Sequence, residues 1–159
     1  MAEIILQNIA HSYNPQATDK TYALNPFNMT WVDGARYAIL GPSGCGKSTM
    51  LNIMSGIVTP SEGKLLFNGS DVTAVSTSER NIAQVFQFPV IYGTMSVEQN
   101  LAFPLVCRKY AKDVIEEKVR EVANALDLVP LLKKSASKLT ADQKQLISLG
   151  RGLVRDDVS

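Results

Sequence analysis

The chain has 159 residues, of which 45% are hydrophobic and 19% are charged, and its formal net charge is +1. This composition is ordinary for a water-soluble domain with one sizeable core, and the near-zero net charge argues against broad electrostatic binding to nucleic acid. The two cysteines, Cys45 and Cys107, form neither a disulfide framework nor a zinc-ligand spacing, which fits a reducing compartment.

The N-terminal segment carries an acidic Glu3 and no basic flank, so it lacks the pattern of a signal peptide. No apolar stretch approaches the roughly 20 residues that a membrane-spanning helix needs. We therefore expect a cytosolic chain, or one that lies on the cytosolic side of a membrane.

Strands are predicted mainly in the first half of the chain. Apolar, alternating or β-branched runs predict strands at Ile4–Ile9, Phe27–Val32, Arg36–Leu40, Lys64–Phe67 and Ile82–Phe86. Turn-forming residues predict a surface loop at Asn14–Thr21 and tight turns at Asp33–Gly34 and Asn68–Gly69.

Helical periodicity appears at three places. Apolar residues at helical spacing predict helices at Ser48–Ser55, which ends at Gly56, at Ala111–Leu126 and at Ala141–Val154. Because strands come first and helices dominate after roughly Val97, the sequence predicts an α/β fold with a helical portion.

A glycine-rich loop lies between the expected strand Arg36–Leu40 and the first expected helix. It satisfies the pattern G-x-x-x-x-G-K-[ST], and the predicted nucleotide-binding residues are Gly41, Ser43, Gly44, Cys45, Gly46, Lys47, Ser48 and Thr49. Glycines allow backbone N–H groups to turn around an anion, and the helix that follows adds its positive end. We expect Lys47 to bridge the β- and γ-phosphates, Ser48 to ligate Mg²⁺ and Thr49 to reach the α-phosphate, with ATP as the nucleotide.

Further motifs follow the loop in a fixed order. They are Val85–Gln87, Phe88–Tyr92, Met95–Leu101, Leu139–Gln145 and Ser148–Val154. With this order and spacing, essentially the whole chain resembles the ATP-binding subunit of an ABC transporter. Segments Glu79–Ala83 and Asn100–Leu105 resemble those of importers for sugars, glycerol phosphate and related polyols.

The resemblance assigns roles to two residues outside the loop. Gln87 matches the glutamine that contacts Mg²⁺ and the attacking water and that senses the membrane subunits; its alternative is a polar residue that ends a strand. Tyr13 matches the aromatic residue that stacks on adenine, a chemistry that suits a flat ring. A core role for Tyr13, or the use of Tyr22 instead, remains open. His11 has no counterpart in the family, and we expect it to be a partly exposed strand residue.

The family signature, Leu-Ser-Gly-Gly-Gln, is altered in this chain. The matching residues are Leu139, Thr140, Ala141, Asp142 and Gln143, and Thr140–Gln143 would face the ATP of a partner subunit. Asp142 places a negative charge near a polyanion, and two unit charges about 5 Å apart repel by about 3 kcal/mol at an effective dielectric constant of 20. We therefore expect a weak composite site and a heterodimer with a second, better-conserved ATPase subunit.

In the family, an apolar strand that ends in an Asp-Glu pair follows the signature helix. Asp156 and Asp157 lack a preceding apolar run and are expected to be surface acids at a helix end. We expect the chain to be truncated before the Asp-Glu strand, so that it binds ATP but hydrolyses it negligibly, while the full-length protein is an ATPase coupled to transmembrane transport.

The resemblance implies three regions and a set of partners. Residues 1–96 are expected to form the ATP-binding core with the phosphate loop and the Gln loop, 97–139 a helical subdomain, and 140–159 the signature helix and truncated end. Phe88–Tyr92 is expected to contribute to a groove for the membrane partner. Membrane-spanning permease subunits and a second ATPase subunit are the expected partners, with a solute-binding protein acting indirectly and no nucleic acid. The chain would lie peripherally on the cytosolic face of the membrane.

Three functions are compatible with these motifs. The first is the energy-coupling subunit of an importer for a sugar or polyol, with glycerol among the candidate solutes. The others are a soluble phosphate-loop kinase and an ABC-type ATPase that moves no solute. A kinase needs an arginine-rich lid, and after Phe103 only scattered arginines such as Arg108 and Arg120 are found.

Overall fold

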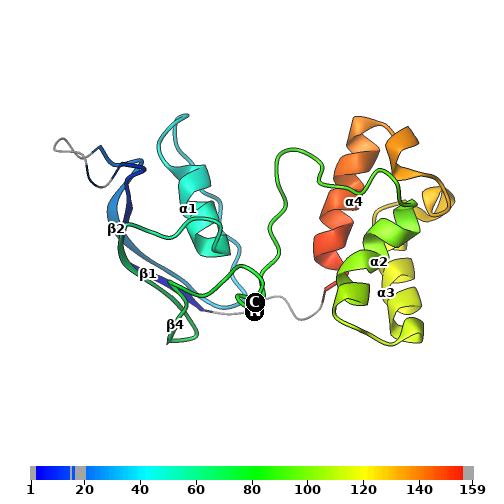
Figure 1. Ribbon diagram of the computed structural model, residues 1–159, viewed down its shortest axis with the longest axis horizontal. Coiled ribbons are helices and arrows are strands. Elements are labelled where there is room, and N and C mark those ends of the chain that lie inside the picture. Colours follow the sequence, from blue (N-terminus) through cyan, green and yellow to red (C-terminus); the bar gives the residue numbers. More distant parts are fainter. Residues whose placement is uncertain (1–2, 15, 17–20, 156–159) are drawn as a thin grey trace. The chain divides into compact units, whose positions relative to one another are not determined.

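The computed structural model describes residues 3–14, 16 and 21–155. Asp156 and Asp157 lie outside the described residues, as does most of the expected loop Asn14–Thr21. The chain divides between Ile82 and Ala83 into two compact units, the first unit before and the second unit after this point. Figure 1 shows the strands and α1 in the first unit and α2, α3 and α4 in the second.

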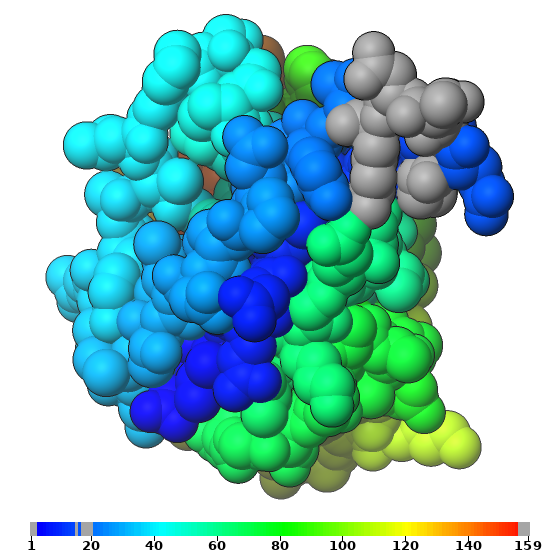
Figure 2. Space-filling model, turned by 90° about the vertical axis from the view of Figure 1, so that its left-hand side faces the viewer, coloured from blue at the N-terminus to red at the C-terminus, as the bar shows by residue number. Residues whose placement is uncertain are grey.

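The first unit is a four-stranded antiparallel sheet with one helix. Its elements are β1 (Ile4–His11), β2 (Leu24–Trp31), α1 (Lys47–Ser55), β3 (Glu62–Phe67) and β4 (Ser70–Asp71). The strand order is β2-β1-β3-β4, and Ile5 of β1 pairs with Thr30 of β2 and with Leu66 of β3. In Figure 2, β1 is the dark-blue band between the lighter blue of β2 and the green of β3.

The core of the first unit forms because α1 packs its apolar side onto the sheet. Burial of apolar surface on both elements stabilises this packing. The buried residues are Leu6, Ile9, Leu24, Met50, Ile53, Met54, Leu65 and Phe67.

The predicted turns of the first unit are confirmed. Gly56 ends α1 with φ 78°, and its backbone N–H is directed to the carbonyl oxygens of Asn52 and Ile53. Asn68 and Gly69 both have positive φ between β3 and β4, which is the conformation of a type I′ hairpin turn. Asp33–Gly34 is also a turn, but no strand follows it.

Two predicted strands are wrong. Neither Arg36–Leu40 nor Ile82–Phe86 is part of a β-ladder in the described chain. Leu40 is 91% exposed, and Val85 and Phe86 are also exposed. A β-strand forms where the backbone joins a ladder with a neighbouring strand, and neither segment belongs to the described sheet.

The second unit consists of helices. Its elements are α2 (Val97–Cys107), α3 (Lys112–Ala125), η1 (Val129–Leu131), η2 (Ala136–Lys138) and α4 (Ala141–Leu153). The helices predicted at Ala111–Leu126 and Ala141–Val154 are confirmed within one residue at each end. No helix in the described part of the chain is long and apolar enough to cross a membrane.

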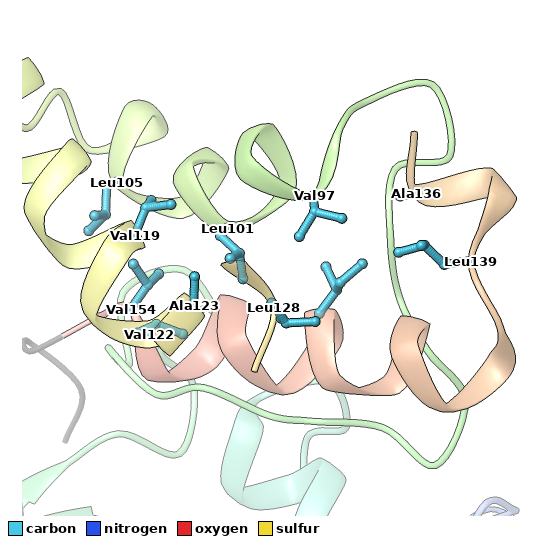
Figure 3. Close-up of a cluster of buried hydrophobic side chains, with 11 residues drawn as sticks. Val97, Leu101, Leu105, Val119, Val122, Ala123, Leu128, Ala136, Leu139 and Val154 are labelled. Carbon is cyan, nitrogen blue, oxygen red and sulfur yellow. The ribbon is translucent and has the colours of Figure 1, made fainter. Parts of the chain in front are cut away.

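Figure 3 shows the core of the second unit, in which side chains from α2 and α3 point towards α4. The buried cluster contains Val97, Leu101, Leu105, Val119, Val122, Ala123, Leu128, Ala136, Leu139, Ile147 and Val154. Gly150 of α4 permits a close approach, because a Cβ there would lie 2.6 Å from Leu101 Cδ2. Residues 83–96 belong to this unit, and the three-part division expected from the sequence stays a prediction.

Candidate nucleotide-binding site

The glycine-rich segment forms a tight turn into α1. The backbone N–H of Cys45 lies 3.4 Å from the carbonyl oxygen of Pro42, and Met50 N–H donates to the carbonyl of Gly46 at 2.9 Å. Gly46 is the N-cap of α1 and has φ 94°. The chain therefore reverses in the loop and enters the helix within a few residues.

Only glycine fits at position 46. A Cβ there would lie 2.7 Å from the carbonyl oxygen of Ala23 and 2.9 Å from Leu24 Cδ1, and the positive φ adds strain for any other residue. Gly44 also has a positive φ, 81°, but a Cβ there would meet nothing within 4 Å. Position 46 is restricted by both space and conformation, and position 44 by conformation alone.

A cavity of about 270 Å³ opens at the N-terminus of α1. Its lining comprises Ala23, Ser43, Gly44, Gly46, Lys47, Ser48 and Thr49. No side chain caps this helix end, and no acidic residue lies in its first turn. The first amides of α1 therefore keep their hydrogen-bonding capacity at the positive end of the helix, which suits an anion such as a phosphate chain.

The side chain of Lys47 brings a positive charge to this loop. Its Nζ donates to the carbonyl oxygens of Gly41 at 2.7 Å and Pro42 at 2.6 Å and lies 3.6 Å from Cys45 Sγ. These contacts hold the ammonium beside the cavity that its own backbone helps to line. Such a site combines backbone amides, a helix terminus and a cation, and it can bind a polyphosphate.

Tyr13 lies next to the same helix. Its hydroxyl is 3.3 Å from Thr49 Oγ1, and the residue is 67% exposed. His11 packs edge-to-face with Tyr13, with ring centroids 4.6 Å apart. The expectation of a partly exposed His11 is wrong, because the residue is 8% exposed and its Nδ1 lies 3.3 Å from Ser61 Oγ.

The hydroxyl of Ser61 lies between the ring of His11 and the backbone. Ser61 Oγ is 3.1 Å from the carbonyl oxygen of Ser12, to which it donates, and 3.3 Å from Nδ1 of His11. The structure thus ties the ring of His11 to the backbone beside Tyr13. The sequence showed only a lone histidine in a strand.

Gln87 belongs to the second unit, where it lies exposed at a bend. The segment around it is held by helix side chains: Gln145 Nε2 donates to the carbonyl of Phe86 at 3.0 Å, and Ser148 Oγ accepts from Val90 N–H at 3.3 Å. Arg151 Nη1 donates to the carbonyl of Val90 at 2.6 Å.

Asn100 of α2 fixes the end of this segment. It is fully buried, accepts from Tyr92 N–H at 2.8 Å, and donates to the carbonyls of Tyr92 at 3.0 Å and Ser96 at 2.9 Å. Arg151 also lies over the ring of Tyr92, 4.6 Å from its centroid. Sequence reasoning did not assign these two residues; a polar Asn100 inside an apolar helix face was the available signal.

The altered signature segment forms the start of α4. Thr140 is the N-cap: its Oγ1 accepts from Gln143 N–H at 3.3 Å, and Gln143 Oε1 accepts from Thr140 N–H at 3.2 Å. This reciprocal capping box satisfies two backbone donors at the helix terminus. Ala141 and Asp142 are exposed in the first turn.

Comparison with known proteins identifies the family. A family pattern described as ABC transporter matches residues 24–157, most of the chain. The chain belongs to the ABC transporter family, as an ATP-binding domain. The resemblance read from the motifs is thereby confirmed.

Curated relatives of this ABC domain include import proteins. This chain is 41% identical over 155 residues to the trehalose import ATP-binding protein SugC of Mycobacterium tuberculosis. The matched region covers 98% of this chain and 38% of that protein. The chain is 38% identical over 156 residues to the sn-glycerol-3-phosphate import ATP-binding protein UgpC of Escherichia coli, with 98% and 43% covered. The chain thus spans about two fifths of the length of these relatives.

Solved ABC structures share the fold. The cbiO1 structure from Clostridium perfringens, part of the ABC transporter complex cbiONQ, matches with a TM-score of 0.80 and 29% identity, covering 95% of this chain and 61% of that chain. A nucleotide-free ATP-binding cassette from an ABC transporter matches with a TM-score of 0.77 and 26% identity, covering 97% of this chain and 65% of the other. The prediction of an ABC-ATPase fold with an antiparallel β portion and a helical part is confirmed.

Within this ABC domain, the predicted site residues fall into two groups. Tyr13 and the loop Gly41–Thr49 come together in the first unit, whereas Gln87 and Thr140–Gln143 belong to the second. Among the described residues, no group of three or more His, Cys, Asp and Glu side chains lies together as a metal site. The hydroxyl of Ser48, at the cavity, is a suitable oxygen ligand for Mg²⁺, an ion that protein sites often hold through few side chains and the substrate's phosphates.

Proposed function

We propose that the intact protein is the ATP-binding and ATP-hydrolysing energy-coupling subunit of an ABC importer for a sugar or polyol. The observation that carries the proposal is the cavity at the uncapped N-terminus of α1, where Gly46 has no space for a side chain and Lys47 holds a positive charge. This combination suits the phosphate chain of a nucleotide.

Each residue of the loop has a proposed task in this function. The backbone amides of Gly44–Ser48 bind phosphate oxygens, and the ammonium of Lys47 moves from its carbonyl partners to the β- and γ-phosphates. Ser48 and Gln87 would hold Mg²⁺, which would offset the charge of the phosphates, and Gln87 would orient the attacking water. The proposal uses the fact that Lys47 and Ser48 line the same cavity.

Tyr13 is the proposed platform for adenine. Its ring is exposed, and its hydroxyl contacts Thr49, which is expected to reach the α-phosphate. A base stacked on Tyr13 would therefore lie at the α-phosphate end of the site. These features favour Tyr13 over the alternative of a core residue.

The substrate class rests on the relatives. The two relatives at about 40% identity are a trehalose import and an sn-glycerol-3-phosphate import ATP-binding protein. We propose a sugar or polyol, with glycerol among the candidates, as the solute of this protein. Membership of the ABC transporter family favours this function over a phosphate-loop kinase.

The state of the signature segment supports a heterodimer. The capping box occupies the N–H groups of Thr140 and Gln143, and Asp142 adds a negative charge in the first turn of α4. Both features disfavour a γ-phosphate at this helix end, where the helix dipole contributes only about 0.3–1 kcal/mol. We propose that a second ATPase subunit supplies the competent signature.

An exposed apolar surface supports contact with permease subunits. Phe88, Val90 and Tyr92 are exposed large hydrophobic residues directly after Gln87. A cluster of this kind marks interaction surfaces more often than monomer surfaces. The protein would then lie on the cytosolic face of the membrane through its permease partners, with a solute-binding protein acting on the other side.

Two measurements on the intact protein test this function. Calorimetry should detect MgATP binding that Lys47→Ala weakens; no binding by the unaltered protein would contradict a nucleotide function. Co-purification with membrane-embedded subunits and ATP-dependent uptake of sugars or polyols into vesicles should both be seen. An ATPase that hydrolyses ATP without membrane partners or uptake would instead support an ABC-type ATPase that moves no solute.

The hydrolysis step itself is tested on residues 1–159. The described residues contain no Asp-Glu pair at the end of a strand, so we propose that this part binds ATP and does not turn it over. Steady-state turnover by residues 1–159 that is lost in Lys47→Ala would contradict this.

A further inference from the structure

Arg80 is a buried cation whose guanidinium donates hydrogen bonds to backbone carbonyls of the described chain. It is 4% exposed. Its Nη1 donates to the carbonyls of Ile53 at 2.5 Å and Met54 at 3.1 Å, its Nε to that of Val75 at 2.9 Å and its Nη2 to that of Thr73 at 2.9 Å. One guanidinium thus joins the last turn of α1 to the segment after β4.

The charge of this guanidinium is balanced by the end of a helix. The last carbonyls of α1 carry the negative end of its dipole, and α1 has no basic residue of its own in its last turn. Burial lowers the pKa of Arg80 from its ordinary value. A buried charge is a costly way to gain stability alone, because apolar residues of similar volume commonly stabilise a site as well or better.

The helix end is shaped to receive this side chain. Gly56, the C-cap of α1, has φ 78°, and a Cβ there would lie 2.8 Å from Arg80 Nε and 3.0 Å from Arg80 Cζ. The guanidinium therefore lies directly against the helix terminus. Any side chain at position 56 would displace it.

Arg80 lies in the chain between the nucleotide-binding helix α1 and Gln87. Two of its acceptors, the carbonyls of Ile53 and Met54, lie in the last turn of α1, about 10 Å along the helix from Lys47, where the helix begins. Two residues after Arg80, Ile82 packs on the core of the first unit and ends that unit. Gln87 follows five residues later. The same side chain thus holds both the nucleotide-binding helix and the segment that leads to Gln87.

We infer that Arg80 is a positioning residue of the nucleotide site. Its side chain connects the C-terminal end of α1 to the segment before Gln87, so that a shift of α1 on nucleotide binding reaches residues 83–87. The inference rests on the proposed nucleotide function. It assigns to Arg80 no contact with nucleotide or metal.

The first test compares Arg80→Lys with the intact protein by amide hydrogen exchange, with and without MgATP. Lysine keeps the charge but cannot match four carbonyls with a planar fork. In the unaltered protein, MgATP should change the amide exchange rates of residues 83–87. Arg80→Lys should reduce this change about fivefold or more, because it loses a hydrogen bond made by a charged group. Its Kd for MgATP should change less than about threefold, because the substitution lies far from the phosphate loop. Arg120→Lys, at an exposed position of α3, is the control.

The second test uses two glycines with the same backbone conformation. Gly56→Ala brings a Cβ against Arg80, whereas Gly69→Ala, at φ 77°, places its Cβ in open space. Both substitutions carry the strain of a positive φ, so their difference isolates the collision with Arg80. Only Gly56→Ala should reduce the exchange response.

The outcomes separate the inference from the function on which it rests. Absence of MgATP binding in the unaltered protein would overturn both. Binding without any change at residues 83–87, or a full response in Arg80→Lys, would overturn the inference alone. A parallel fall of melting temperature, affinity and exchange response would show a merely structural role and would also overturn it.

Discussion

The ammonium nitrogen of Lys47 lies 2.7 Å from the carbonyl oxygen of Gly41, six residues earlier in the same loop. The contact closes the loop on itself and keeps a positive charge beside the cavity at the start of α1. The carbonyls of Gly41 and Pro42 are weaker partners for this ammonium than a phosphate, because hydrogen bonds between two charged groups are stronger. We therefore expect the ammonium of Lys47 to release these carbonyls and bind an anion when one enters the cavity.

Lys47→Ala should weaken MgATP binding about 10- to 100-fold, which corresponds to the loss of hydrogen bonds to a charged group. Calorimetry on the intact protein measures this change. Lys64→Ala is the matched control, because Lys64 is a largely exposed lysine of β3 in the same unit. Equal losses in the two variants would contradict a specific role for Lys47.

Gly46→Ala should destabilise the first unit by about 2 kcal/mol more than Gly44→Ala, since both have a positive φ but only position 46 adds a collision with Ala23 and Leu24. Urea unfolding followed by circular dichroism gives the difference. If the two substitutions cost the same, the restriction at position 46 is conformational alone.

Gly150→Ala and Gly152→Ala should have opposite effects although both lie in α4. A Cβ at Gly150 would meet Leu101 Cδ2 at 2.6 Å, whereas at Gly152 its neighbours are at 3.6 Å. We expect Gly150→Ala to cost about 1–3 kcal/mol through overpacking and Gly152→Ala to stabilise by up to about 1 kcal/mol through helix propensity. Thermal unfolding of the two variants should show melting temperatures on opposite sides of the unaltered protein. A stabilised Gly150→Ala would show that the helices separate more easily than this packing implies.

Thr140→Ala should destabilise α4 by about 1 kcal/mol, because it removes the N-cap that accepts from Gln143 N–H. Thr94→Ala removes the same atoms at an exposed position and serves as the control. Chemical denaturation compares the two. An unchanged free energy of unfolding in Thr140→Ala would mean that water replaces the cap without cost.

The stability of the first unit should depend on Asp71 at acid pH. The Thr73 hydroxyl at 2.6 Å, the Thr73 N–H at 2.9 Å and the Lys64 ammonium at 3.9 Å together lower the pKa of Asp71 below its ordinary 3.8. A carboxyl whose pKa is lower in the folded state stabilises the fold above its unfolded pKa, and this contribution is lost as the pH falls through the folded pKa. Unfolding curves measured from pH 6 to about pH 2 should therefore show a larger acid-dependent loss of stability in the unaltered protein than in Asp71→Asn. Identical pH profiles would contradict it.

The local parts of this protein follow from the sequence. The start of α1 after the glycine-rich turn, the turn at Asn68–Gly69 and the ends of α3 and α4 were predicted within one residue, because each depends on neighbours a few positions away. Glycine permits positive φ, a G-K-S sequence at a helix start leaves amides free, and apolar residues at helical spacing form one face. The resemblance to the ABC transporter family rests on the same local motifs.

The tertiary structure alone decided the rest. Arg36–Leu40 and Ile82–Phe86 have the composition of strands, yet neither joins the described sheet, because a strand requires a neighbouring strand that the segment does not itself specify. His11 is buried and Arg80 lies against Gly56 because residues 24 to 50 positions away approach them. Contacts across such separations produce no periodic pattern in the sequence, because the burial of a residue and the identity of its contacts depend on how the whole chain packs.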